Sequence, residues 1–168
     1  MRRSTKIILI IFVVIVCLVA FIFCNSAEEQ KESAEKSTGI LKLIIETFNI
    51  EDSAKINSLH KAVRKTAHAI EFAALGVLLS VFFRKFERRN GRKYISLPMF
   101  VGLLVGVIDE FIQSFNDRSS EVGDILIDFG GVLFGLFITM WIYSIVDKKR
   151  RERRHRRIYE IEENYYSV

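Results

Sequence analysis

Two adjacent carboxylates and an amide stand at the end of an otherwise apolar stretch, VIDEFIQ, at residues 107–113. On a helix, Gln113 lies one turn from both acids, because it follows Asp109 by four residues and Glu110 by three. Carboxylates can accept hydrogen bonds from a ligand, bind cations, or act as general acids and bases. Charges placed against lipid cost a few kcal/mol or more. The acids are therefore expected to face a polar partner or a site.

A second set of ionisable residues lies in the stretch VRKTAHAIEF, at residues 63–72, and consists of Arg64, Lys65, His68 and Glu71. His68 is three or four residues from each of the others, so it lies at the centre of their helical stripes. A less specific interpretation is also open for two of them. His68 could form only an interhelical hydrogen bond, and Arg64 could reach lipid phosphates as an interfacial anchor.

A third set consists of Glu121, Asp124 and Asp128, which are spaced i, i+3, i+7 and share one helix face. Asp124 is close to the expected start of a helix, where a negative charge is favoured by the helix dipole. Asp128 lies one turn deeper, so the dipole does not account for it. Together the three sets form a pattern of paired acids, one imidazole and a few cations.

The elements that must position these residues are apolar blocks. The chain has 168 residues, half of them apolar, and the polar and apolar residues segregate as in a polytopic membrane protein. A hydrocarbon core about 30 Å thick takes about 20 helical residues to cross. Four blocks fit this length: residues 7–24, 66–83, 95–113 and 122–146. A cleaved signal peptide is the alternative for the first block, but this block has no small-x-small cleavage site.

The Lys and Arg residues predict the orientation of these spans. They concentrate before the first span, in RKFERRNGRK between the second and third, and in KKRRERRHRR after the fourth. Short loops rich in Lys and Arg face the cytoplasm. The sequence therefore predicts an all-α bundle of four transmembrane helices with both termini cytoplasmic. The net charge of +5 follows from this topology, so no nucleic-acid partner is expected.

Two segments lie outside the predicted spans. Apolar residues recur at helical spacing over residues 40–48, which predicts an amphipathic extracytoplasmic helix, acting either as a membrane anchor or as a lid over the bundle. A second stripe, over residues 56–63, leads into span two. The transmembrane domain, residues 1–146, is followed by a basic cytoplasmic tail, residues 147–168, suited to anionic lipids. The end of this tail is a candidate for disorder.

With this topology, every ionisable residue inside spans two to four falls in the outer half of the membrane. The sequence thus predicts one polar cluster built from three helices. The expected cationic partners of its acids are Arg64, Lys65 and Arg118. Small-residue patterns at residues 102–106 and 131–135, Gly-x-x-x-Gly in each case, predict close helix packing. Cys17 and Cys24 are interpreted as buried apolar residues without redox chemistry.

These residues together resemble the VanZ-like family. The resemblance extends to about residue 145 and rests on Lys65-x-x-His68-x-x-Glu71, Asp109-Glu110-x-x-Gln113, Arg118 and Asp124-x-x-x-Asp128. It implies a multi-pass protein of the bacterial plasma membrane. The founding member of that family is associated with tolerance of teicoplanin, a glycopeptide that acts at the outer membrane face on lipid-linked cell-wall precursors. The resemblance implies no particular reaction.

The first hypothesis is a binding site for an anionic lipid headgroup or a lipid-linked glycan. Arg64, Lys65 and Arg118 would hold phosphate or carboxylate through charge-assisted hydrogen bonds. Gln113 and Asp124 would complete the site by binding polar groups or ordering the cations. The expected partners are membrane lipids, and the expected consequence is a change in glycopeptide susceptibility.

The second hypothesis is an integral-membrane enzyme acting on the same lipid class. His68 would be general base or nucleophile, oriented by Glu71 or Asp109, with Glu110 or Asp128 as the acid. One His and several carboxylates can also bind a divalent cation, although no cofactor motif is present. A third hypothesis is a proton-coupled carrier, and a fourth is a purely structural bundle. The sequence assigns neither an enzymatic activity nor an oligomeric state.

Overall fold

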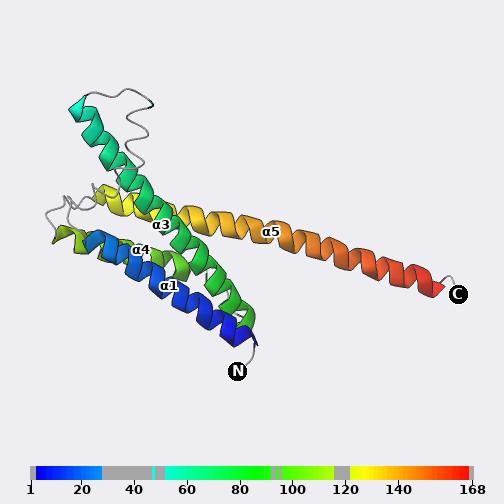
Figure 1. Cartoon of the computed structure of the whole chain (residues 1–168). Coiled ribbons are helices and arrows are strands. Elements are labelled where there is room, and N and C mark those ends of the chain that lie inside the picture. The colour runs from blue at the N-terminus through cyan, green and yellow to red at the C-terminus, as the bar shows by residue number, and fades with distance from the viewer. Residues whose placement is uncertain are drawn as a thin grey trace.

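The described part of the chain is built from helices. The structure is a computed structural model that describes residues 3–27, 47, 52–91, 94, 96–115 and 122–166. Its helices are α1 (Arg3–Ala27), α3 (Ser53–Asn90), α4 (Ser96–Ser114) and α5 (Val122–Tyr166) (Figure 1). All four are long and apolar enough to cross a membrane, which confirms the prediction of four candidate spans. The predicted amphipathic helix falls almost entirely outside the described residues.

Two of the helices are much longer than the spans predicted within them. α3 has 38 residues and α5 has 45. At a rise of about 1.5 Å per residue, both greatly exceed a hydrocarbon core of about 30 Å. α3 begins at Ser53, so the stripe over residues 56–63 is continuous with span two, as predicted. The end of the tail is a candidate for disorder by sequence, but α5 continues through it to Tyr166. The helix is not interrupted there because no Gly or Pro follows Gly135.

The ends of α3 are fixed by local hydrogen bonds. Asp52 is the N-cap, and its side chain accepts a hydrogen bond from the Ala54 backbone N–H at 2.9 Å. At the other end, Gly91 adopts a left-handed conformation with φ of 69°, and its N–H donates to the Glu87 carbonyl at 2.7 Å. The Glu87 carboxylate accepts the Tyr94 backbone N–H at 2.6 Å. These contacts hold Gly91 and Tyr94 against the C-terminal end of α3.

The most extensive helix contact joins α3 to α5, which cross in Figure 1. The Gly131-x-x-x-Gly135 pattern lies at this crossing. An added Cβ at Gly131 would stand 2.5 Å from the Ala69 carbonyl oxygen, and one at Gly135 would overlap the Ala73 carbonyl oxygen. Gly76 on α3 faces the backbone of α5 in the same way. The glycines therefore let the two backbones touch, which confirms their predicted packing role.

α1 and α4 pack beside this pair. α1 contributes Ile15 and Ile22 to a buried core, and α4 contributes Val105. The other members of the core come from α3 and α5: Phe72, Leu75, Leu79, Val132 and Leu136. The ring centroids of Phe12 and Phe82 are 6.2 Å apart, so the start of α1 lies beside the C-terminal half of α3 (Figure 1). α1 and α3 are therefore antiparallel.

The two ends of the bundle differ in chemistry, and its sides are apolar. Large apolar side chains are exposed on every helix, among them Phe12, Ile70, Phe100, Phe111, Phe134 and Phe137. Such surface suits lipid rather than water. One end, formed by the C-terminal ends of α1 and α4 and the start of α5, holds the buried acids. The opposite end holds the Arg- and Lys-rich C-terminal part of α3.

Candidate functional site

The acids and the amide predicted from VIDEFIQ form a buried polar cluster at one end of the bundle. Asp109 is fully buried, and Glu110, Gln113 and Asp128 are nearly so. They come from α4 and α5 and face other helices. Burial of acids in helices of this kind is costly without partners. The cluster is therefore a built feature of the fold, and its partners determine what it can do.

His68 lies at the centre of the cluster, as its helical position predicts. Its Nδ1 atom is 3.8 Å from a carboxylate oxygen of Glu71 and 4.0 Å from one of Asp109. These distances are longer than direct hydrogen bonds, yet each would be an ion pair if the imidazole carried a proton. An imidazole between two carboxylates is a suitable acceptor or donor of a proton.

Gln113 links α4 internally and to α1. Its Nε2 atom donates to Asp109 at 2.8 Å, which confirms the pairing expected from the i, i+4 spacing. The same nitrogen lies 3.4 Å from the hydroxyl oxygen of Ser26, near the end of α1. The amide therefore fixes the orientation of the Asp109 carboxylate and connects it to a helix that the sequence did not assign to the site.

Lys65 and Asp124 form an ion pair between α3 and α5. The Lys65 Nζ and Asp124 Oδ1 atoms are 2.5 Å apart, and both side chains are partly exposed. The sequence assigns Lys65 as a partner of Asp109 and Glu110, whereas the ion pair seen here joins it to Asp124. This ion pair lies at the exposed edge of the cluster and joins the two helices that pack most closely.

The sequence predicts a cluster of three helices, but α1 is a fourth contributor. Asn25 donates through Nδ2 to Glu71 at 3.1 Å, and the fully buried Ser26 contacts Gln113. The predicted first span ends at Cys24, two residues too early to include both Asn25 and Ser26. The contribution of α1 could have been predicted from the topology. In that topology the C-terminal end of span one lies on the same side of the membrane as the cluster.

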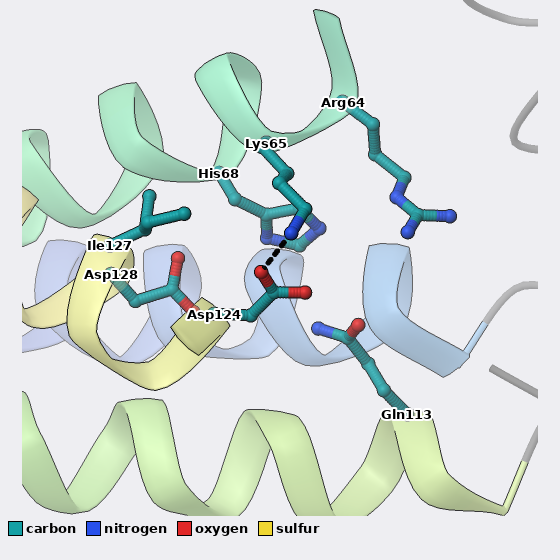
Figure 2. Close-up of a pocket in the computed structure, with 7 residues that line it drawn as sticks. All are labelled: Arg64, Lys65, His68, Gln113, Asp124, Ile127 and Asp128. Atoms are coloured by element: carbon teal, nitrogen blue, oxygen red, sulfur yellow. Dashed lines mark ion pairs between the residues drawn. The ribbon is translucent and has the colours of Figure 1, made fainter. Parts of the chain in front are cut away.

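A small pocket opens beside these residues and is shown in Figure 2. Side chains from three helices line it: Arg64, Lys65, His68, Gln113, Asp124, Ile127 and Asp128. Its free space is about 10 Å³, the room for about one water molecule. Lys65 and His68 project from α3 toward Asp124 and Asp128 on α5, Arg64 extends on the side away from Asp128, and Gln113 reaches in from α4. The pocket therefore combines cations, acids and a hydrogen-bonding amide.

Two predicted residues fall outside the described part of the chain, Arg118 and Glu121. Glu71, Asp109 and Glu110 are described and belong to the cluster, although they do not line the pocket. Within the described residues, no three His, Cys, Asp or Glu side chains are arranged to hold a metal ion. Cys17 and Cys24 are free thiols on α1 and both are exposed, so the expectation that they are buried is wrong.

Comparison with protein families identifies the chain. The family model for VanZ/LLP1 matches residues 11–143. The chain belongs to the VanZ/LLP1 family. Within this VanZ/LLP1 protein, the match includes every described residue of the polar cluster, from Asn25 to Asp128, and stops before the basic part of α5. Searches of curated proteins and of solved structures gave no match.

Proposed function

We propose that this VanZ/LLP1 protein lies in a bacterial plasma membrane with both termini cytoplasmic and its polar cluster at the outer face. The orientation is supported by the distribution of Lys and Arg, which are concentrated at the N-terminus, between α3 and α4, and along the last part of α5. All three segments lie on one side of the four candidate spans. The end that holds Asp109 and His68 then faces the outside.

The proposed function is binding of an anionic lipid headgroup or a lipid-linked cell-wall component at this outer end. The observation that carries the proposal is the pocket, in which Arg64 and Lys65 stand next to His68 and Gln113 on helices that can span a membrane. Guanidinium and ammonium groups bind phosphate and carboxylate through charge-assisted hydrogen bonds. The headgroup of a lipid in the bilayer can reach a site at this outer end of the spans.

The geometry favours binding at the mouth of the pocket. Its free space accommodates about one water molecule, so a sugar or a whole headgroup does not fit inside. An incoming anion would bind between Arg64 and Lys65 and exchange with Asp124 as the partner of Lys65. Asp128, which lines the pocket, would accept a hydrogen bond from a hydroxyl group of the ligand. Binding of the lipid-linked precursor at this site would lower the access of teicoplanin to that precursor.

The test compares two variants of the site with wild type in a strain that lacks the gene. Asp109→Asn keeps an oxygen that can accept from Gln113, and Arg64→Gln removes a cation from the pocket. A lost charge-assisted hydrogen bond is worth about 1.5–3 kcal/mol. We therefore expect Arg64→Gln to weaken lipid binding by at least about tenfold. Both variants should abolish the wild-type effect on teicoplanin susceptibility at equal membrane levels.

Lys61→Gln is the matched control, because Lys61 is exposed on α3 and does not line the pocket. It should behave as wild type. If Arg64→Gln and Asp109→Asn both keep the wild-type effect, the binding proposal is wrong. If both proteins disappear from the membrane while Lys61→Gln does not, the cluster has a structural role instead.

A second candidate function is catalysis on the same lipid class. The observation in its favour is the position of His68, with Glu71 and Asp109 each about one ion-pair distance from the imidazole. A carboxylate so placed can orient a His that acts as a general base. The envelope lipid profile of the same strains distinguishes the two functions. A catalyst produces a modified lipid that His68→Gln fails to produce, whereas a binding protein leaves the covalent structure of every lipid unchanged.

A further inference from the structure

A second and much larger pocket lies at the opposite end of the bundle from the polar cluster. It has a volume of about 530 Å³ and is formed by α3, α4 and α5 together with Tyr94. Ligand sites in proteins commonly have about 300–1,000 Å³. Most of its lining is apolar and includes Phe83, Met99, Leu133 and Met140. The pocket therefore suits a large apolar group.

The polar end of this pocket is built around Arg84. The Arg84 guanidinium forms an ion pair with Asp147 on α5, and its centre lies 4.2 Å from the centroid of the Tyr143 ring. Arg88 reaches the same carboxylate at 3.6 Å. The Arg84 Nε atom is buried and has no hydrogen-bond acceptor among the described residues. Buried donors are normally paired, so this N–H is available to an oxygen of a ligand.

The surrounding charge favours an anion at this end. Among the described residues around Arg84, two acids are present, and each is already engaged: Asp147 with the two arginines, and Glu87 with the Tyr94 backbone N–H. Further cations lie close along the chain, namely Lys85, Lys148, Lys149, Arg150 and Arg151. Tyr94 lines this pocket and Tyr143 contacts Arg84, and aromatic residues of this kind are expected where a helix bundle meets lipid headgroups.

We propose that this pocket binds one anionic phospholipid from the leaflet on the basic side of the membrane. One acyl chain would occupy the apolar pocket, and the phosphate would accept hydrogen bonds from Arg84 and Arg88. By the measure in which the small pocket of about 10 Å³ holds about one water molecule, the large pocket of about 530 Å³ has ample room for an acyl chain. The site is independent of the outer cluster, since the two pockets share no residue. Only the name of the leaflet, the cytoplasmic one, depends on the proposed orientation.

The experiment is native mass spectrometry of the full chain from nanodiscs that contain equal amounts of phosphatidylglycerol and phosphatidylcholine. Wild type should retain one phosphatidylglycerol. Arg84→Gln should reduce the preference for phosphatidylglycerol about tenfold, the effect of losing one charge-assisted hydrogen bond. Arg88→Gln should reduce it in the same direction, and Arg154→Gln, an exposed change farther along α5, should leave it unchanged.

A pair of pocket-filling substitutions provides a test that does not alter the ion pair. Leu133→Trp with Met140→Trp enlarges two side chains of the pocket lining on α5, and Phe134→Trp with Ile142→Trp places two tryptophans at exposed positions that do not line it. The first pair should abolish lipid retention, and the second should not. Equal retention of both lipids by wild type, or full retention by the filled variant, would overturn the proposal. If Arg84→Gln fails to fold, the comparison of the two tryptophan pairs decides.

Discussion

At the scale of single residues, the hydrogen bond from Asn25 to Glu71 ties α1 to the polar cluster. Asn25→Ala removes the only donor that the described residues show for that carboxylate oxygen. Hydrogen bonds between membrane helices contribute about 0.6 kcal/mol on average and up to about 1.7 kcal/mol. We expect Asn25→Ala to lower the free energy of unfolding by about 1 kcal/mol, measured by thermal unfolding in detergent.

A double-mutant cycle with Glu71→Gln separates this contact from other effects. If the two side chains interact, the double variant loses less stability than the sum of the single variants. Strict additivity would mean that the contact contributes nothing, and α1 would then be held by its apolar face alone. Thr5→Ala serves as the control, because this residue lies at the other end of α1, away from the cluster.

The residues of the site were predictable in type and spacing, but the pairing between residues on different helices was not. The i, i+4 relation of Asp109 and Gln113 is local, so it follows from helix geometry alone. The ion pair between Lys65 and Asp124 depends on how α3 and α5 rotate against each other. No local rule gives that rotation. The role of Asn25 was missed for the same reason, since 46 residues separate it from Glu71.

At the scale of the helices, the crossing of α3 and α5 depends on glycines that touch a facing backbone. A Cβ at Gly135 would overlap the Ala73 carbonyl oxygen, which is backbone and cannot move aside like a side chain. Gly135→Ala is therefore expected to lower the free energy of unfolding by about 1–3 kcal/mol, as other overpacking changes do. Thermal unfolding of the purified protein measures this loss.

Gly130→Ala is the matched control for the crossing, because a Cβ at Gly130 meets nothing within 4 Å. It replaces the same residue type on the same helix, one step from Gly131. Since Ala favours a helix over Gly by about 1 kcal/mol or less, stability should be unchanged or slightly higher. Equal losses from both substitutions would show that the close contact with Ala73 is not the reason for the cost at Gly135.

The helices were more predictable than their lengths. Apolar blocks locate the four spans, because about 20 apolar residues are needed to cross a bilayer. They do not show where a helix ends beyond the bilayer, which depends on caps and on the absence of breakers. The polar start of α3 at Ser53 and the charged end of α5 illustrate this, since neither is apolar. The large pocket was not predicted, because its lining comes from three helices and one connecting residue.

At the scale of the whole molecule, the two ends of the bundle carry opposite chemistry. The buried acids gather at one end, and the other continues into the helical rod of α5, which extends away from the bundle in Figure 1. Residues 148–157 of this rod include eight Lys and Arg residues. The polar cluster and the basic end of α5 therefore lie on opposite sides of the membrane. The proposed function depends on which of these sides is outside the cell.

Labelling of single cysteines in intact cells tests that orientation. In a background with Cys17→Ala and Cys24→Ala, Lys61→Cys places a thiol near the polar cluster, and Arg151→Cys places one on the rod. Both positions are exposed. A membrane-impermeant maleimide should label Lys61→Cys in intact cells and Arg151→Cys only after permeabilisation, because segments rich in Lys and Arg remain cytoplasmic. The opposite pattern would place the cluster inside the cell, where it could not act on precursors exposed to teicoplanin.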